Sequence, residues 1–175
     1  MGHQISDLTA RAKRVRLAIF DVDGVMTDGT LYIGARGEAL KAFNILDGHG
    51  LRMLREAGVV TAILSGRKHA AVDRRAKELS IDHVVQGRSD KVPEFEKLIK
   101  RLKLEANACA YVGDDLPDLP VLRRCGLAVA VANAVEAVKA EAHYVTRAAG
   151  GRGAVREVCD LILAARGQLG AAAVV

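Results

Sequence analysis

Residues 17–29 read Leu17-Ala18-Ile19-Phe20-Asp21-Val22-Asp23-Gly24-Val25-Met26-Thr27-Asp28-Gly29, an apolar run that ends in acidic residues. The apolar part predicts a buried strand, and Gly24 lets the backbone turn away after it. Side chains two positions apart in an extended chain point to the same face, so Asp21 and Asp23 begin side by side. A second apolar run, residues 108–112, is followed by further acidic residues at Asp114, Asp115 and Asp118. Two strands therefore deliver carboxylates to their carboxyl ends.

The rest of the chain alternates apolar runs with amphipathic segments. Between the runs, apolar side chains recur every three or four residues, which is typical of helices packed on a sheet. The pattern predicts an α/β fold, a three-layer doubly wound parallel sheet, with residues 1–175 as a single domain. The predicted strands lie near residues 15–22, 59–64, 82–86, 108–112, 127–131 and 143–146.

One segment departs from this alternation, at about residues 29–46. Two short apolar stretches flank a glycine-containing turn there, which predicts a β-hairpin that protrudes after the first strand. Exposed apolar strands need cover, so we expect a second copy of the chain to supply it. Asn133 and Glu136 resemble a capping box for a helix over about 134–141. The end of the chain, about 167–175, is expected to be loosely ordered.

Composition excludes several classes of protein. The 175 residues carry a formal charge of +5, and half of them are hydrophobic, which suits one compact core. Aromatic residues make up only 3%, which argues against stacking on nucleic acid. The three cysteines show no metal-binding or disulfide spacing, so we expect reduced thiols in a cytoplasmic protein. We find no signal peptide or membrane-spanning stretch in the sequence, and expect no membrane partner.

Four groups of polar residues follow predicted strands or begin a predicted helix. Because ligands bind at the carboxyl ends of strands in open α/β sheets, we expect these groups to converge. Carboxylate oxygens suit Mg²⁺, and a carboxylate with a hydroxyl and a lysine suits phosphoryl transfer through an aspartyl phosphate. The predicted catalytic residues are Asp21 as nucleophile, Asp23 as general acid and base, and Ser65 and Lys91 as phosphate ligands. The predicted Mg²⁺ ligands are Asp21, Asp114 and the backbone carbonyl of Asp23.

The order of Asp21-Val22-Asp23-Gly24, Ser65-Gly66-Arg67, Lys91 and Gly113-Asp114-Asp115-Leu116-Pro117-Asp118 resembles the four motifs of the haloacid dehalogenase-like hydrolases. Segments 44–50 and 150–157 are similar to the corresponding segments of members that hydrolyse phosphate esters of 3-deoxy-2-keto sugar acids. The expected substrate is the phosphate of the eight-carbon acid used in lipopolysaccharide precursors. The resemblance implies a capless enzyme and a homotetramer in which hairpins form a shared barrel and a neighbour helps close the site. The substrate-binding residues that it implies are Asp23, Asn44, Ile45, Leu46, Asp47, Gly48, Arg52, Arg67, Arg75 and Lys91.

Other interpretations stay open at this point. The substrate could be a nine-carbon keto sugar acid phosphate or another small phosphate ester. The chain could also be a phospho-accepting signalling module, although its acidic pair follows the first strand rather than the third, or a catalytically silent assembly domain. Arg75 could belong to a charged helix face. Asp118 could cap a helix or orient Asp114 or Lys91, and the roles of Asp115, His49 and the segment 150–153 remain open.

Overall fold

The computed structural model describes residues 2–169, so the part of the predicted loose tail beyond them lies outside the described residues. A six-stranded sheet with the order β5-β4-β1-β6-β7-β8 forms its centre, and every neighbouring pair in it is parallel. This confirms the predicted doubly wound α/β fold. The strands are β1 (Leu17–Phe20), β4 (Val60–Leu64), β5 (His83–Val85), β6 (Cys109–Gly113), β7 (Leu127–Ala130) and β8 (Tyr144–Val145).

The strands at the centre of the sheet are buried on both faces. All four residues of β1 and all five of β6 are buried, as expected for strands covered by helices on both sides. Phe20 and Tyr111 are among the largest fully buried side chains. Burying one large apolar side chain stabilises the fold by about 1.5–3 kcal/mol, so this apolar centre is what fixes the strands whose ends form the site.

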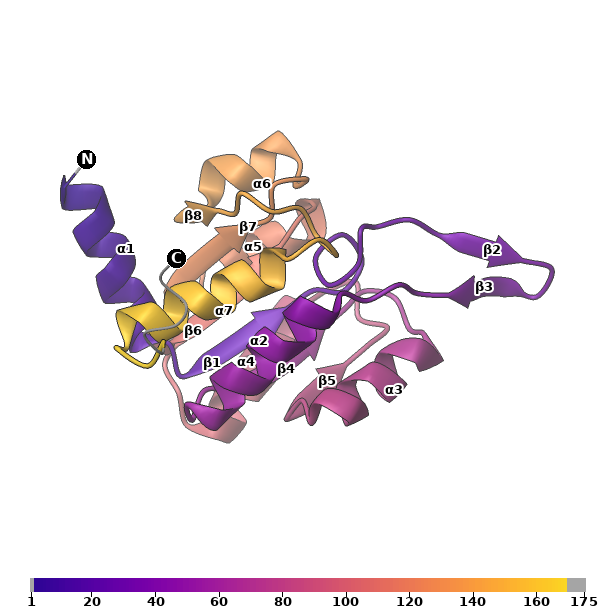
Figure 1. Ribbon diagram of the computed structural model, residues 1–175, viewed down its shortest axis with the longest axis horizontal. Helices are drawn as coiled ribbons and strands as arrows, with labels where there is room; N and C mark the ends of the chain where they lie inside the picture. The colour runs from indigo at the N-terminus through magenta and orange to yellow at the C-terminus, as the bar shows by residue number, and fades with distance from the viewer. Residues whose placement is uncertain (1, 170–175) are drawn as a thin grey trace.

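Helices cover both faces of the sheet (Figure 1). On one face α2 packs against α7 and α7 against α1, while on the other face α5 contacts both α4 and α6. The helices are α1 (Gly2–Arg14), α2 (Ile45–Glu56), α3 (Ala70–Leu79), α4 (Val92–Leu102), α5 (Leu119–Leu122), α6 (Glu136–Glu141) and α7 (Ala154–Ala165). Two short 3₁₀ helices are η1 (Ala106–Ala108) and η2 (Leu116–Asp118). None of the helices in the described part is long and apolar enough to cross a bilayer.

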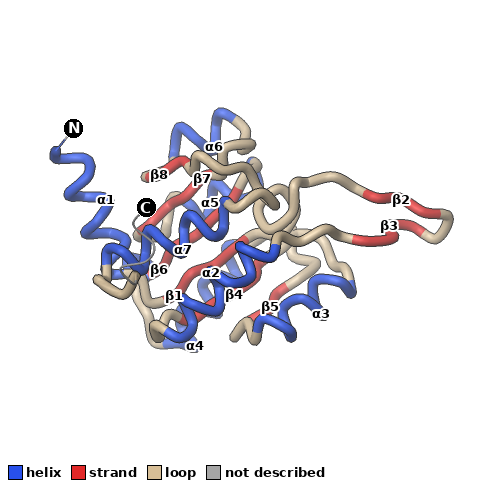
Figure 2. Tube along the Cα trace, viewed as in Figure 1, coloured by secondary structure: helices blue, strands red, loops and turns tan. Residues whose placement is uncertain are grey.

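The predicted hairpin consists of β2 (Tyr32–Gly34) and β3 (Gly37–Leu40), which pair with each other in antiparallel fashion and not with the main sheet. Figure 2 shows it as an arm that extends away from the helices and strands of the main body. Only this arm lies between β1 and α2, and only α3 and β5 lie between β4 and α4. The described residues therefore contain no cap domain over the strand ends.

Candidate active site

The carboxyl ends of β1, β4 and β6 form a cleft of about 440 Å³. In the sheet β1 lies between β4 and β6, and later strands are added outward from β1 on both sides. Open α/β sheets bind ligands at the carboxyl ends of the strands where the strand order reverses in this way. The structure thus brings together groups that are far apart in sequence. The predicted residues that line this cleft are Asp21, Asp23, Ser65, Arg67, Lys91 and Asp114.

Asp21 is the first residue after β1 and is 9% exposed. Its Oδ1 accepts a hydrogen bond of 2.7 Å from the backbone of Val22, and its Oδ2 lies 2.9 Å from Lys91 Nζ. Burial raises the pKa of Asp21 to about 6, because the attraction of Lys91 only partly offsets the loss of water and Asp118 adds repulsion. The carboxylate is therefore held in one orientation, but the positive charge of Lys91 does not fully compensate for its burial.

Beneath Asp21 lies a buried network that sequence reasoning found only in part. Lys91 Nζ donates to Asp118 Oδ1 at 2.6 Å, and the hydroxyl of Tyr111 donates to the same oxygen at 2.6 Å. Burial alone would lower the pKa of Lys91, but Asp21 and Asp118 outweigh it and raise that pKa above its usual value. Tyr111 was missed because a tyrosine inside an apolar strand carries no signal of a polar role. Lys91 is consequently a fixed cation at the floor of the cleft.

Asp118 has both of the roles that the sequence left open. It forms a capping box with Asp115 at η2, and its Oδ2 accepts backbone hydrogen bonds from Asp114 at 3.0 Å and Asp115 at 3.2 Å. Since its Oδ1 already accepts from Lys91 and Tyr111, four donors surround this carboxylate. Asp118 therefore fixes the loop after β6, and its oxygens are occupied within the protein.

Asp114 is the carboxylate that most requires a cation. Burial, with repulsion from Asp118, Asp21 and Asp115, raises its pKa to about 7. Oxygens of Asp21, Asp114 and Asp118 lie within 4.8 Å of one another. Because Asp118 is already surrounded by donors, Asp21 and Asp114 are the side chains available to a divalent ion. This donor set of hard oxygens fits Mg²⁺.

The loop after β1 has a conformation that only glycine tolerates. Gly24 has a φ of +86°, and a Cβ there would lie 2.0 Å from Asp114 Oδ2.

The predicted capping role of Asn133 is wrong, because α6 begins after Val135. The Asn133 side chain instead donates to the carbonyl of Gly24 and accepts from the amide of Gly150. A Cβ on Gly150 would lie 1.7 Å from the Gly24 oxygen. The glycines of segment 150–153 thus support the loop that carries Asp23.

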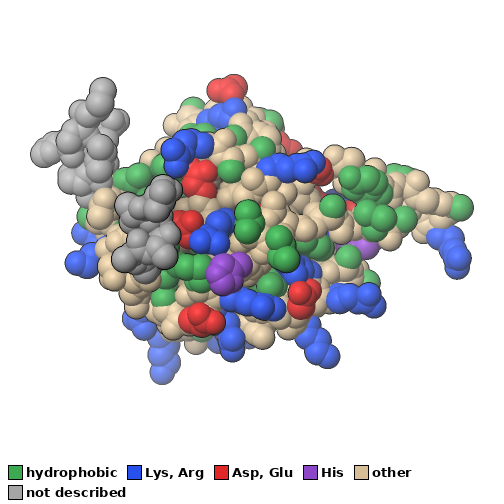
Figure 3. All heavy atoms as spheres, in the orientation of Figure 1, with side chains coloured by type: hydrophobic (Ala, Val, Ile, Leu, Met, Phe, Trp, Pro, Cys, Tyr) green, Lys and Arg blue, Asp and Glu red, His purple; other side chains and the backbone are tan. Residues whose placement is uncertain are grey.

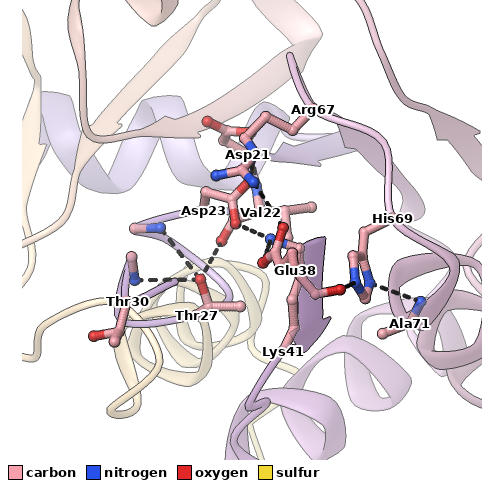
Figure 4. Close-up of polar contacts among 12 residues, drawn as sticks. Asp21, Val22, Asp23, Thr27, Thr30, Glu38, Lys41, Arg67, His69 and Ala71 are labelled. Atoms are coloured by element: carbon pink, nitrogen blue, oxygen red, sulfur yellow. Dashed lines mark hydrogen bonds and ion pairs between the residues drawn. The ribbon is translucent and has the colours of Figure 1, made fainter. Parts of the chain in front are cut away.

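Asp23 is contacted by residues of the projecting arm (Figure 4). Lys41, which follows β3, forms an ion pair with Asp23 and lies 2.8 Å from Glu38. Glu38 also accepts a hydrogen bond of 2.7 Å from Arg67 Nη2. Sequence reasoning did not select Glu38 or Lys41. Their opposite charges, three residues apart between the apolar residues of the second hairpin strand, were the available signal.

Ser65 and Arg67 follow β4, as predicted. Ser65 is 2% exposed, and its backbone donates to Val85 at 2.9 Å and accepts from Arg88 at 3.2 Å. Its position on the turn is therefore fixed by the neighbouring strand end. Arg67 is about half exposed and reaches across the cleft toward the arm.

The other residues implied to bind substrate lie in α2, just before it at Asn44, and on α3, and do not line this cleft. Asn44 caps α2 by accepting from the backbone of Leu46 at 2.8 Å, and buried Asp47 accepts from the backbone of Arg156 at 2.8 Å. Arg75 pairs with Glu78 at 2.8 Å. A separate hollow of about 410 Å³ is lined by Ile45, Leu46, Gly48, His49, Arg52, Arg75, Glu78 and Leu79.

Comparison with known proteins connects this geometry to a family. The haloacid dehalogenase-like hydrolase family model matches residues 81–157. A protein from Yersinia pestis named 3-deoxy-D-manno-octulosonate 8-phosphate phosphatase KdsC is 49% identical over 168 residues, which cover 96% of this chain and 90% of that protein.

Two solved structures share the fold over nearly their whole length. A probable YrbI family phosphatase from Pseudomonas syringae is 56% identical, with a TM-score of 0.93 and 96% of each chain covered. The 3-deoxy-D-manno-octulosonate 8-phosphate phosphatase from Moraxella catarrhalis, solved with magnesium, phosphate and KDO, is 44% identical, with a TM-score of 0.92, and 94% of this chain and 95% of that chain are covered. The motif order, the strand-end cleft and these relatives together place the chain in the haloacid dehalogenase-like hydrolase family.

Proposed function

We propose that this chain is a Mg²⁺-dependent phosphatase that hydrolyses 3-deoxy-D-manno-octulosonate 8-phosphate to the free keto sugar acid and phosphate, a step in making lipopolysaccharide precursors. The observation that carries the proposal is the convergence of Asp21, Asp114 and Lys91 at the ends of adjacent parallel strands. Relatives from Yersinia pestis and Moraxella catarrhalis that bear this activity in their names support the choice of substrate.

In the proposed reaction Asp21 attacks phosphorus and forms an aspartyl phosphate. Asp23 gives a proton to the leaving sugar oxygen and then takes one from the water that hydrolyses the phosphoenzyme. Ser65 and Lys91 hold the phosphate oxygens and stabilise the charge that develops on them. The buried contacts of Lys91 with Asp21 and Asp118 support this role, because they keep the ammonium group charged and in place.

Mg²⁺ would be held by Asp21, Asp114 and the backbone carbonyl of Asp23. When bound, the ion neutralises the repulsion between a carboxylate nucleophile and a phosphate dianion. The raised pKa values of Asp21 and Asp114 support this assignment, since both carboxylates lack a sufficient countercharge in the protein alone. Asp118 is assigned no metal contact because four protein donors already surround it.

The substrate carries a carboxylate at the end remote from its phosphate, and an arginine can pair with such a group through two hydrogen bonds. We assign this recognition to Arg67 in the cleft and to the remaining substrate-binding residues, which lie in or just before α2 and on α3. In their own chain those residues lie outside the cleft. The proposal therefore places them at a site completed by a neighbouring copy. They are Asn44, Ile45, Leu46, Asp47, Gly48, Arg52 and Arg75.

The proposed assembly is a homotetramer in which the arms of neighbouring copies pack together. Figure 3 shows hydrophobic side chains gathered on the projecting arm. On and beside it, Tyr32 is 41% exposed, Ile33 66%, Leu40 50% and Ile45 79%. An arm of this kind is a liability in water unless another surface covers it. Light scattering coupled to size-exclusion chromatography tests the assembly, and a monomer at assay concentration would contradict it.

A cytoplasmic location is also proposed. Cys109, Cys125 and Cys159 are all free and buried, which agrees with a compartment that keeps thiols reduced. Burial raises the pKa of Cys109 and of Cys125 to about 12, so neither has the thiolate character of a reactive cysteine.

The function is tested by measuring phosphate release from a panel of eight-carbon and nine-carbon keto sugar acid phosphates, with Mg²⁺ and with EDTA. We expect the eight-carbon ester to have the highest kcat/KM and to require Mg²⁺. Asp21→Asn should abolish turnover without unfolding the protein, and Asp73→Asn, an exposed carboxylate on α3, serves as the matched control. Equal turnover of all esters, or an active Asp21→Asn enzyme, would reject the proposal.

A further inference from the structure

Two charged side chains of the arm are buried against the cleft. The side chain of Lys41 is only 2% exposed and that of Glu38 only 8%, although both belong to a hairpin whose other residues face solvent. A buried ammonium group is costly unless carboxylates surround it. Lys41 meets this condition, because it lies between Asp23 and Glu38 (Figure 4).

The two oxygens of Asp23 have different surroundings. Lys41 Nζ contacts Oδ1. Arg67 Nε lies 3.9 Å from Oδ2, which is beyond hydrogen-bonding distance. Arg67 donates instead to Glu38 Oε2 at 2.7 Å. Lys41 therefore holds the carboxylate through Oδ1, while Oδ2 faces Arg67 and accepts no hydrogen bond from the described residues.

Glu38 organises both cations. One of its oxygens faces Lys41 and the other accepts from Arg67. Glu38 thus holds Lys41 next to Asp23 Oδ1 and directs the Arg67 hydrogen bond to itself, which leaves Arg67 Nε 3.9 Å from Asp23 Oδ2. Its backbone oxygen also contacts the ring of His69, the residue that caps α3. These contacts join the base of the arm to the body of the protein.

We propose that Lys41 is a positioning residue for the reaction, which holds Asp23 through Oδ1 so that Oδ2 exchanges the proton with the leaving group and then with water. The inference rests on the proposed phosphatase function. As Asp21 bonds to phosphorus, the bond to the leaving oxygen breaks, and that oxygen takes the electron pair and the proton from Asp23. Water then bonds to phosphorus, gives its proton to Asp23, and the Asp21–phosphorus bond breaks.

This role predicts an effect that depends on the leaving group. A sugar alkoxide is a poor leaving group and needs the proton, whereas 4-nitrophenolate leaves without one. A variant that misplaces Asp23 should therefore lose more activity on the sugar phosphate than on 4-nitrophenyl phosphate. A residue that only binds phosphate or supports the fold would affect both esters alike.

The experiment compares kcat/KM for these two esters in the wild type, Lys41→Met and Lys41→Arg. Lys100→Met, an exposed lysine on α4, is the matched control. For Lys41→Met we expect about a tenfold or greater fall on the sugar phosphate and less than about a threefold fall on the nitrophenyl ester, since general acid catalysis contributes about 10²–10⁴. Lys41→Arg should recover most of the loss, and Lys100→Met should match the wild type.

A second variant, Glu38→Gln, keeps Lys41 and should also lower kcat/KM more for the sugar phosphate than for the nitrophenyl ester. It tests the proposal even if Lys41→Met fails to fold. Equal falls on both esters, a rise in KM alone, unchanged rates or faster turnover would each overturn the role of Lys41. Should the wild type not hydrolyse the sugar acid phosphate, the substrate assignment fails by itself. The comparison is then made with phenyl and 4-nitrophenyl phosphate.

Discussion

Replacing Asp118 with asparagine tests the buried network beneath the nucleophile. In the structure this carboxylate accepts four hydrogen bonds: from Lys91 at 2.6 Å, from Tyr111 at 2.6 Å, and from the amides of Asp114 at 3.0 Å and Asp115 at 3.2 Å. An asparagine side chain of the same shape presents an NH₂ group to two of them. Two hydrogen bonds are then lost, and Lys91 loses one of its two carboxylates.

The cost follows from these contacts. A hydrogen bond to a charged group contributes about 1.5–3 kcal/mol and a neutral one about 1 kcal/mol, so Asp118→Asn should lower the free energy of unfolding by about 3 kcal/mol. For a chain of this length the corresponding fall in Tm is about 6–12 °C. The measurement is urea and thermal unfolding in EDTA at a fixed protomer concentration.

Asp115→Asn is the control, since it is the same change in the same loop. Asp115 is exposed, and its side chain caps η2 by accepting from the backbone of Leu116 at 2.8 Å and by taking part in the capping box with Asp118. Because asparagine caps a helix about as well as aspartate, this change should cost less than about 1 kcal/mol. If Asp118→Asn were no less stable than Asp115→Asn, the network would not hold Lys91 in the way the structure indicates.

Three further predictions concern the loops and their charges. Gly24→Ala should abolish Mg²⁺ binding measured by calorimetry, because its Cβ would overlap Asp114; unchanged affinity would contradict this. Burial raises the pKa of Asp21 to about 6 and that of Asp114 to about 7 in the folded state, above the unfolded values near 3.8. Between these pH values the folded state therefore binds more protons than the unfolded state. Without metal, the free energy of unfolding should therefore fall as pH rises from about 4 to 7. The affinity for Mg²⁺ should increase over the same range, because the carboxylates lose their protons. A Tm in EDTA that does not change with pH would contradict the raised pKa values. Asp47→Ala leaves the backbone amide of Arg156 without its 2.8 Å acceptor and should cost about 1–3 kcal/mol in urea unfolding, while unaltered stability would refute the contact.

The fold was predictable because its signals are local. The apolar runs and helical spacing gave six strands close to their observed positions, and the rule for parallel sheets placed Asp21, Ser65 and Asp114 at one edge. The hairpin was also expected, since its turn and its two apolar stretches stand out from the alternation.

What the sequence could not supply depends on contacts between distant segments. Asn133 resembles a helix cap, yet the close approach of Gly24 and Gly150 gives it two backbone partners more than 15 residues away. Tyr111 and Lys41 acquire polar roles only because folding buries each of them beside a carboxylate. Local pattern carries no information about such pairings.

The central claim is that Asp21 takes the phosphate from the substrate. Rapid mixing with a labelled sugar phosphate in Mg²⁺, acid quenching and mass spectrometry of the peptides test it most directly. The account predicts a transient phosphorylated peptide modified at Asp21, which forms and decays at rates compatible with turnover and is absent in EDTA. Phosphate found on another residue, or steady turnover with no phosphorylated peptide under conditions that trap acyl phosphates, would contradict it.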